Sequence, residues 1–423
     1  MKRSLICLLV LVLLLGTAST AAAEETQTIR VLWWGSQARH DLTVAAIDVF
    51  MEKNPNIHVE IEFTDWGGYW SKLATQAAGG MVPDVVQMDY AYITQYAGND
   101  VLADLTPYVE SGALDVSNIS ETILDSGKVD GKLYAIPCGS TAPVLMYRPD
   151  VLEQAGLSMP IEPTESEYAQ LMQKVYDATG RTNRSDTSYD NGLRTIVRNY
   201  GLNLYNDEGT ALGFDDPSYI VYMWERYLSE VEYGHCLKVG EGTASTAFDA
   251  YISDIWATCH SSNELAAYQT GSNCDLELAL LPAMDDATQP HSYVKPTMFW
   301  SIYKDSSVKE AAIEFINFYT HDTDCYDIMS FDRGIPVSSK VREHLMPSLD
   351  DTGKKIVEIM DYLEDGHSSP VMNPDIPVHG ELNTLFANYF EQVEYGMVED
   401  LTAHAQAFMD EANAIIANSL TAE

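Results

Sequence analysis

The chain has few basic residues and, after its N-terminal segment, no long hydrophobic run. Lys and Arg together number 24 against 63 Asp and Glu, which gives a formal net charge of −39 at pH 7. A surface this negative repels nucleic acid and anionic lipid headgroups. No later stretch offers the roughly 20 apolar residues that a transmembrane helix needs. These shortages argue against a nucleic-acid binder and a membrane-spanning protein, and they suit a neutral or locally neutralised ligand.

Recognisable catalytic and metal-binding motifs are also missing. The sequence contains no Gly-x-Ser-x-Gly, His-Glu-x-x-His or Walker-type loop, and its ten histidines are scattered without ligand spacing. His40 and Asp41 are sequence neighbours, which is not the geometry of a triad. Carboxylates are so abundant that a pair at glycosidase separation could arise by chance. We therefore expect no catalytic residue, no metal site and no cofactor.

Cysteine is scarce, and no Cys-x-x-Cys occurs, so a zinc or redox motif is unsupported. Cys7 lies in the N-terminal apolar run, which leaves an odd number of cysteines for the rest of the chain. If the chain is exported, Cys259–Cys274 is the first disulfide to test. The alternative is that the cysteines are small buried thiols. The remaining ones are Cys138, Cys236 and Cys325.

The N-terminus has the features of a secretory leader. A basic start, an apolar core from Leu5 to Leu15 and three alanines before Glu24 predict a signal peptide over residues 1–23. Cys7 lies too early to be a lipid-modified cysteine at the cleavage site. We expect an exported, soluble protein, periplasmic or at the cell surface or extracellular, without a lipid anchor. Uncleaved anchoring is the alternative.

The first third of the mature chain alternates strand and helix patterns. Residues 29–34, 57–63 and 83–89 read as strands, and amphipathic helix patterns follow the first two, so the order βαβαβ predicts a parallel doubly wound sheet. Ligands bind at the carboxyl ends of such strands. Trp33 and Trp34 point to opposite faces of the first strand, so one is expected in the core and the other in a cleft. Aromatic and polar side chains gather at these three ends: Trp33, Trp34, Ser36, Asp65, Trp66, Tyr69, Trp70, Asp89, Tyr90 and Tyr92.

The later sequence is mostly helical between residues 149 and 294, with strand patterns at 253–257 and 276–281. Residues 293–302 return to strand character, and the tail beyond Lys340 is again helical. No low-complexity linker separates these parts. Two lobes without a linker argue for segments interleaved in sequence, with several chain crossings.

Several sequence pieces, in this order and behind a signal peptide, carry a family resemblance. The chain resembles the carbohydrate-binding extracellular solute-binding proteins of ABC importers, the broad group that includes maltose-binding protein, over essentially its whole mature length. The pieces are Trp33-Trp34-Gly35-Ser36, Pro83 to Asp89, Gly131 to Pro137, Tyr147 to Asp150, Ala155-Gly156-Leu157, Ala311 to Phe318 and Arg333 to Pro336.

The resemblance implies an α/β fold of the two-lobe periplasmic-binding-protein type II, with each lobe a sheet flanked by helices and the ligand cleft between them. It places crossings near 135–140, 296–301 and 333–338. The expected division is residues 24–137 plus 299–335 for the N-terminal lobe and 138–298 plus 336–423 for the C-terminal lobe. It further implies a non-enzymatic monomer that carries a carbohydrate to a membrane permease with its cytoplasmic ATPase.

Strand-end position and family match together select ten ligand-binding candidates. Several have structural alternatives: Asp89 as a helix cap, Arg333 as a partner of Asp332, and Arg39 as a first-turn surface residue. Tyr92 and Phe299 are reserves. The candidates are Trp34, Ser36, Arg39, Trp66, Tyr69 and Asp89 from the first lobe, Ser140, Trp300 and Arg333 from the crossings, and Trp256 from the second lobe.

Two other classes of function compete with this interpretation. A secreted enzyme acting on polysaccharide could use the same aromatics as subsites, and an adhesion or scaffold protein would have no cleft. The sugar itself stays open. The net charge disfavours a long anionic oligosaccharide, but Arg39, Lys295 and Arg333 near the expected cleft could reverse this locally.

Overall fold

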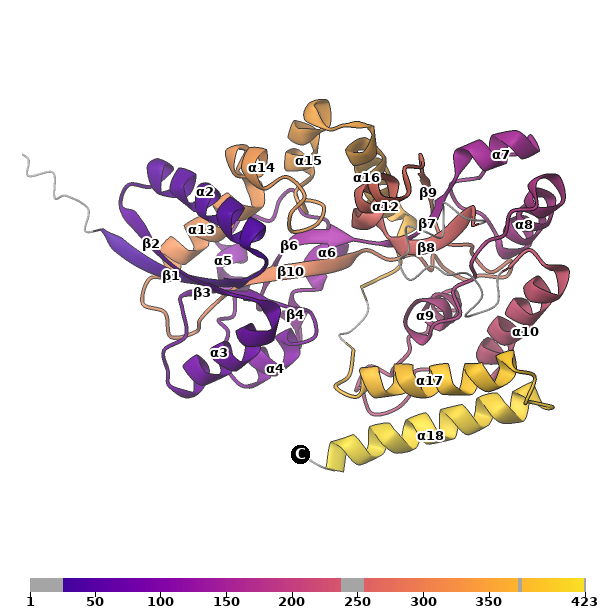
Figure 1. Cartoon of the computed structure of the whole chain (residues 1–423). Coiled ribbons are helices and arrows are strands. Elements are labelled where there is room, and N and C mark those ends of the chain that lie inside the picture. Colours follow the sequence, from indigo (N-terminus) through magenta and orange to yellow (C-terminus); the bar gives the residue numbers. More distant parts are fainter. Residues whose placement is uncertain (1–25, 237–254, 372–374, 422–423) are drawn as a thin grey trace, which may run out of the picture.

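The computed structural model describes residues 26–236, 255–371 and 375–421, so the predicted signal peptide lies outside the described residues. Two lobes lie side by side, and the long strands β6 (Ile136–Thr141) and β10 (Lys295–Ile302) run from one toward the other (Figure 1). Within the described ranges, no helix combines the length and the apolar character that crossing a membrane requires. The two-lobe α/β arrangement confirms the predicted fold class.

The N-terminal lobe is built on a five-stranded sheet in the order β2-β1-β3-β10-β6. The first three strands are parallel, with Val31 opposite both Ile61 and Val85, and β10 joins β3 antiparallel. These three parallel strands agree with the sequence prediction, because their β-branched and apolar runs are bounded by clear turn residues. Their bounds are β1 (Gln27–Trp34), β2 (Ile57–Thr64) and β3 (Val85–Met88).

Helices cover both faces of this sheet. Ser36 and Asp65 cap the two longest helices of the first βαβαβ unit, because their side chains accept the amide hydrogens of Arg39 and Gly68. The helices of this lobe are α2 (Gln37–Lys53), α3 (Trp66–Ala78), α4 (Ile93–Gly98), α5 (Thr106–Glu110), α6 (Glu121–Asp125), α13 (Lys309–His321) and α14 (Thr323–Met329). A small hairpin, β4 (Lys128–Val129) and β5 (Lys132–Leu133), leads into β6.

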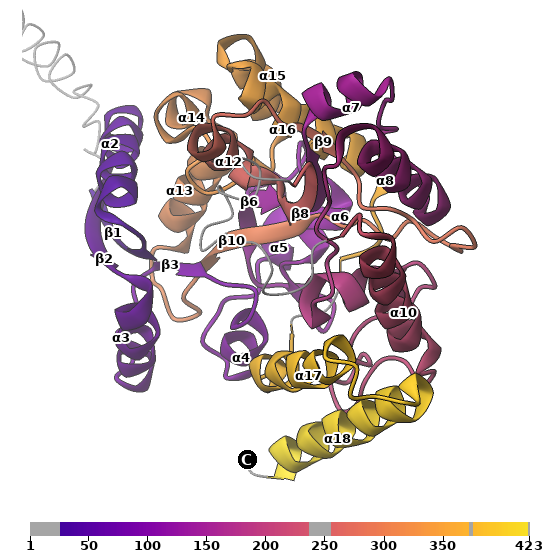
Figure 2. The same ribbon diagram turned by 45° about the vertical axis from the view of Figure 1, so that its right-hand side comes forward.

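The second lobe has a three-stranded antiparallel sheet in the order β8-β7-β9 and is otherwise helical. Two long C-terminal helices, α17 (His379–Glu394) and α18 (Leu401–Thr421), run side by side and pack against α10 in both views (Figures 1 and 2). The other elements are β7 (Pro143–Tyr147), β8 (Ala257–Ser261), β9 (Glu277–Ala279), α7 (Pro149–Ala155), α8 (Glu165–Thr179), η1 (Tyr189–Leu193), α9 (Arg194–Arg198), α10 (Ser218–Tyr233), η2 (Ser262–Glu264) and α12 (Leu265–Ser272).

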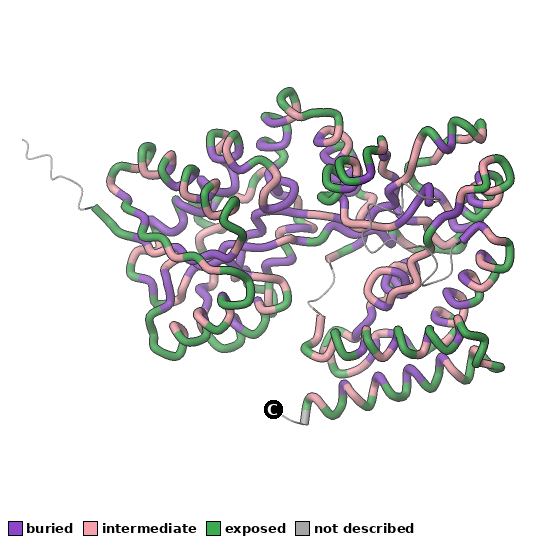
Figure 3. Tube along the Cα trace, in the orientation of Figure 1, coloured by how far each residue is buried: buried purple, intermediate pink, exposed green. Residues whose placement is uncertain are grey.

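A third group of helices lies above the crossing strands (Figure 1). Two of them, which the sequence analysis assigned to the C-terminal lobe, share one hydrophobic cluster with β1 and β10 through Val341 and Ile356. Buried residues follow the strands and the inner helix faces, and the outer faces are exposed (Figure 3). The predicted lobe division therefore stays a prediction here. These elements are α15 (Ser339–Leu345), η3 (Met346–Ser348), α16 (Asp351–Tyr362) and η4 (Leu363–His367).

The three predicted crossing segments lie against one another. Strand β6 pairs with β10, and on its other side the backbones of Ser140 and Ile335 exchange two hydrogen bonds of 2.8 and 2.9 Å. Gly139 allows this approach, because a Cβ atom there would lie 1.8 Å from the Arg333 carbonyl oxygen. Gly334 adopts φ +97°, which disfavours residues with a side chain. The crossings are thus one packed, hydrogen-bonded layer.

One local expectation for the second lobe was wrong, and the question of a disulfide, which the sequence left open, is decided. The strand expected at 253–257 is β8 at Ala257–Ser261, four residues later, and residues 253 and 254 lie outside the described ranges. No disulfide joins Cys259 to Cys274. Cys259 faces the interior of the lobe, where burial raises the pKa of its thiol, while Cys274 follows α12 and its amide contacts Ser272. Both cysteines are therefore thiols, buried or partly buried, as in the alternative interpretation.

Candidate ligand-binding site between the lobes

A cavity of ≈ 360 Å³ opens where the two lobes face each other at the crossing strands. Asp89 contributes to it from the end of β3 in the first lobe, and Glu264 from η2 in the second. Strands β6 and β10 contribute to its lining as well. The lining residues are Asp89, Tyr90, Ala91, Thr141, Ser261, Asn263, Glu264, Lys295, Pro296, Thr297 and Asp375. A ligand here would touch both lobes and both crossing strands at once.

Most of the lining residues have polar or charged side chains. Asp89 accepts a hydrogen bond from the Ala91 amide at 2.9 Å. Burial raises the pKa of its carboxyl, while the hydrogen bond and the charge of Lys295 oppose that rise. Across the cavity, Glu264 accepts from the Ser261 amide at 3.2 Å and so fixes the turn after β8. Carboxylates in such positions bind the hydroxyl donors of a polar ligand.

Asp375 is held in place by a cluster of charged residues in the second lobe. Arg194 is buried, and its Nη2 atom donates to both Asp375 oxygens, at 2.9 and 3.1 Å, and to Asp190 at 2.7 Å. His379 lies between the two carboxylates, and its hydrogen bond together with Arg194 holds the pKa of Asp190 well below its usual range. Asp375 also acts electrostatically on Tyr90, whose pKa is raised mainly by burial. This cluster therefore faces the first lobe.

An aromatic cluster occupies the same edge of the N-terminal sheet. Trp66, the first residue of α3, is 46% exposed and packs edge-on against Trp34 at 5.1 Å and Trp70 at 5.4 Å between ring centroids. Trp70 stacks on Tyr92 at 3.7 Å. The Trp66 ring lies 6.2 Å from that of Tyr92, which is two residues beyond the cavity-lining Tyr90, but Trp66 is not itself part of the lining. An exposed indole on a rigid aromatic base is suited to a sugar ring.

Three of the four indoles expected to line the cleft are buried instead. The exposed fraction is 6% for Trp34 and 0% for Trp256 and Trp300. Trp256 precedes β8 rather than ending a strand, and it packs near Tyr168 at 6.1 Å. Trp300 points into the sheet–helix interface, where it packs against the helix α13. These indoles cannot stack on a sugar in this conformation, so the expectation of four exposed indoles was wrong.

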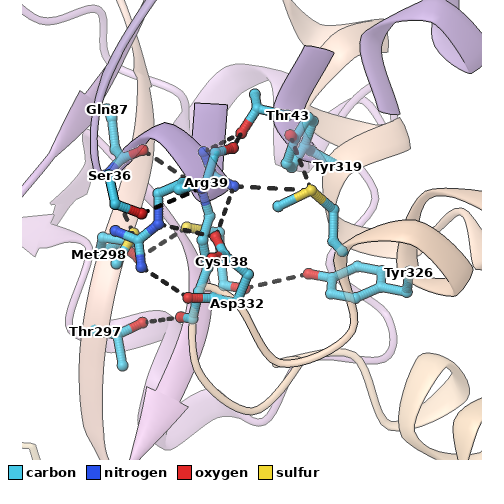
Figure 4. A network of polar contacts seen from close by, with 12 residues as sticks. Ser36, Arg39, Thr43, Gln87, Cys138, Thr297, Met298, Tyr319, Tyr326 and Asp332 are labelled. Carbon is cyan, nitrogen blue, oxygen red and sulfur yellow. Dashed lines mark hydrogen bonds and ion pairs between the residues drawn. The ribbon is translucent and has the colours of Figure 1, made fainter. Parts of the chain in front are cut away.

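The two arginine candidates join elements of the first lobe to the third crossing. Figure 4 shows Arg39 and its contacts with Asp332. Arg39 donates through Nε to Asp332 Oδ2 at 2.8 Å and through Nη2 to the Asp332 carbonyl at 2.7 Å. Arg333 is buried, donates to Thr43 Oγ1 at 3.0 Å, and lies 5.4 Å from the Trp300 ring centroid. Its Nη1 is 3.5 Å from Asp332. Arg333 therefore has the structural role given as its alternative, as a partner of Asp332. Arg39 is partly buried and links α2 to Asp332, so it is not a free surface residue.

The remaining candidates have structural contacts as well. The Tyr69 hydroxyl is buried and donates to the Gln87 carbonyl at 2.5 Å. Ser140 is buried beside Ile335, and Ser36 caps α2. Of the reserves, Tyr92 joins the aromatic cluster and Phe299 is fully buried. Asp89 lines the cavity while also capping a turn. Trp66 has the partial exposure expected of it, and its place in the binding site stays a prediction.

Most of the second lobe's contribution was missed from the sequence. Ser261 is the last residue of β8, and Asn263 and Glu264 follow it in η2, so a correctly placed strand would have put all three at a strand end. The Ser-x-x-Glu spacing of Ser261 and Glu264, a capping box, was a readable signal. Asp375 had no local signal, because only tertiary packing against Arg194 brings it to the cavity.

Comparison with known proteins gives consistent matches. Residues 37–323 match the family model for bacterial extracellular solute-binding protein. Over 192 residues the chain is 27% identical to the arabinooligosaccharide-binding protein of Bacillus subtilis (strain 168). That match covers 43% of this chain and 44% of the relative, so it spans less than half of that protein's length.

Two solved structures share the fold along nearly the whole chain. An extracellular solute-binding protein family 1 from Alicyclobacillus acidocaldarius is 29% identical, with a TM-score of 0.85, over 94% of this chain and 100% of the other. A periplasmic oligogalacturonide binding protein from Yersinia enterocolitica is 21% identical, with a TM-score of 0.78, over 93% of this chain and 99% of the other. At 21% identity, the similarity to the Yersinia enterocolitica protein shows a shared fold and nothing further.

Proposed function

Because the chain belongs to the bacterial extracellular solute-binding proteins, we propose that it captures an oligosaccharide between its lobes and delivers it to the permease of an ABC importer. The observation that carries this proposal is the cavity lined by both lobes and both crossing strands. Its hydrogen-bonding groups suit sugar hydroxyls, and the exposed Trp66 suits an apolar ring face. The Bacillus subtilis relative, by its name, binds an arabinooligosaccharide.

The transport step follows from ligand contacts on both sides of the cavity. A sugar held by Asp89 on one lobe and Glu264 on the other binds a closed arrangement better than an open one, and so shifts the population toward closure. The three crossings are the proposed hinge, with residues 24–137 plus 299–335 and 138–298 plus 336–423 as the two lobes. A membrane permease can then distinguish the closed form. We propose that the exported protein acts as a monomer without a lipid anchor.

The proposal is tested by a thermal-shift screen of the purified chain against arabino-, xylo-, malto-, galacto- and uronic-acid oligosaccharides, followed by calorimetry on any hit. Saturable binding that raises the melting temperature supports it, since a ligand bound only to the native state stabilises that state. The absence of a shift with the whole panel contradicts it. Incubation of each hit with the protein should release no new reducing ends, and their release would favour the polysaccharide-active enzyme instead.

A further inference from the structure

The charges that line the cavity come from both lobes and are mostly negative. Asp89 belongs to the first lobe, whereas Glu264 and Asp375 belong to the second. Lys295, on the crossing strand β10, is the basic side chain of the described lining. Arg194 pairs with both oxygens of Asp375, although it also binds Asp190, so the charge of Asp375 is partly compensated. The charges that face a ligand most directly are therefore those of Asp89, Glu264 and Lys295.

The arginines that could have made the cleft positive are engaged elsewhere. Arg39 is tied to Asp332, and Arg333 is buried against Trp300 and Thr43. Arg198 is buried as well, but it donates to neutral groups of Asn203, Ser369 and Pro370, and it lies 4.9 Å from the ring centroid of Tyr293. No arginine belongs to the cavity lining within the described chain. Within the described lining a sugar carboxylate would thus meet Lys295 as the basic side chain, while Arg194 and Arg198 act on Tyr90 from behind the lining.

We propose, on the basis of the proposed function, that this cavity selects neutral oligosaccharides over uronic-acid oligosaccharides, and that Asp89 and Glu264 impose the selection. Closure of the lobes brings these two carboxylates toward the same ligand. Hydroxyl groups donate hydrogen bonds to both and offset the like charges. A uronic acid adds a third negative charge in a space of low dielectric, where charge repulsion is strong.

The direct test compares matched sugars on the purified full chain. Each neutral hexose oligosaccharide that binds is titrated by calorimetry beside the same oligosaccharide with its primary alcohols oxidised to carboxylates; for the galactose series the pair is α-1,4-galactotriose and trigalacturonate. A pentose oligosaccharide, whose chain units offer no such alcohol, is compared with the same chain carrying a glucuronic acid branch. We expect the neutral sugar to bind at least about tenfold more tightly at low salt. The gap should narrow in ~0.5 M NaCl because salt screens charge repulsion.

Variants assign the selection to particular residues. In the double variant Asp89→Asn, Glu264→Gln, the neutral-to-acidic affinity ratio should fall several-fold, and in Lys295→Gln it should rise. Asp351→Asn, which changes an exposed carboxylate outside the cavity, is the matched control and should leave the ratio unchanged. The ratio of the two affinities is the quantity to compare. Loss of a hydrogen bond lowers the affinity for both sugars, whereas a change of charge alters the affinity for the acidic sugar relative to the neutral one.

The outcomes separate this inference from the proposed function. Binding of uronic-acid oligosaccharides as tight as, or tighter than, their neutral counterparts would overturn the selection and leave oligosaccharide binding intact. An unchanged ratio in the double variant would overturn the role of Asp89 and Glu264. Failure of every saccharide in the panel to bind would contradict the proposed function, and this inference with it.

Discussion

Arg39 of α2 and Asp332 lie 293 positions apart in the sequence and are joined by two hydrogen bonds, one to the carboxylate at 2.8 Å and one to the carbonyl at 2.7 Å. The next residue, Arg333, adds a bond to Thr43 of the same helix. Its own carbonyl accepts a hydrogen bond from Thr297 on β10. Through these contacts the first helix of the N-terminal lobe fixes the position of the third crossing.

Replacing Arg39 by alanine should therefore destabilise the protein. Its side chain and that of Asp332 are 20% and 17% exposed, so their pair lies between a surface and a buried ion pair, and we expect a loss of about 1–3 kcal/mol in the free energy of unfolding. Urea denaturation measures this. Lys354→Ala, which removes an exposed pair with Asp351, is the control and should change stability by less than about 0.5 kcal/mol. Equal effects of the two substitutions would show that the contacts between Arg39 and Asp332 do not stabilise the fold.

Gly139→Ala should disturb the crossing layer itself. Because the added Cβ would lie 1.8 Å from the Arg333 carbonyl oxygen, the backbone of one segment must move, and we expect a loss of about 1–3 kcal/mol. Gly98→Ala is the control, since a Cβ at this α4 position meets no atom within 4 Å. Thermal unfolding of the two variants should give a clear drop for the first and little change for the second. A melting temperature of Gly139→Ala equal to that of the wild type would show that the layer tolerates a side chain.

Trp66→Ala should weaken ligand binding more than it affects folding. The exposed indole is available for a sugar ring, so we expect roughly a tenfold loss of affinity. Tyr395→Ala removes an aromatic ring that is 66% exposed at the far end of α17, and it should leave affinity unchanged. Calorimetry with the best ligand of the panel gives both values. If Trp66→Ala binds the ligand as tightly as the wild type does, Trp66 is not part of the binding site.

Stability should fall between pH 6.5 and pH 4, partly because of His291. Burial lowers the pKa of this imidazole from 6.5 to about 4, although its hydrogen bond to the Leu281 carbonyl opposes that shift. The unfolded chain therefore takes up a proton at higher pH than the folded one does, so folding loses free energy as the pH falls below 6.5. The full effect is roughly 3 kcal/mol.

Chemical denaturation at pH 7 and pH 4.5 tests this contribution. His291→Gln should be less stable than the wild type at pH 7, but it should lose less stability on acidification. His58→Gln, at an exposed position of β2, is the control and should show the wild-type loss. If His291→Gln shows an undiminished loss, the buried imidazole is not a source of the acid sensitivity.

The sequence predicted the fold better than it predicted the site. Strong local periodicity placed β1, β2 and β3, and the edge where Asp89 lies followed from parallel topology. Whether each indole is buried or exposed was harder to predict, because a tryptophan near the end of a strand can pack in the core or line a cleft. Trp300 is held inside by α13, and that packing has no local sequence signal.

The second lobe shows the other limit. The predicted strand ended four residues before β8 does, so the buried Trp256 was selected and the cavity-lining Ser261 and Glu264 were missed. A short apolar run indicates that a strand is present but does not define where it ends. Asp375 could not have been found locally, because its position depends on an ion pair with Arg194, 181 residues earlier in the chain.

Small-angle X-ray scattering tests the central claim most directly, that a sugar bound between the lobes draws them together. The radius of gyration is measured for the chain alone and with a saturating neutral oligosaccharide whose binding has been confirmed by calorimetry. We predict a smaller radius with the sugar, and no change with an equal concentration of a saccharide that does not bind. An unchanged radius at saturation would contradict closure and show that the three crossings do not act as a hinge.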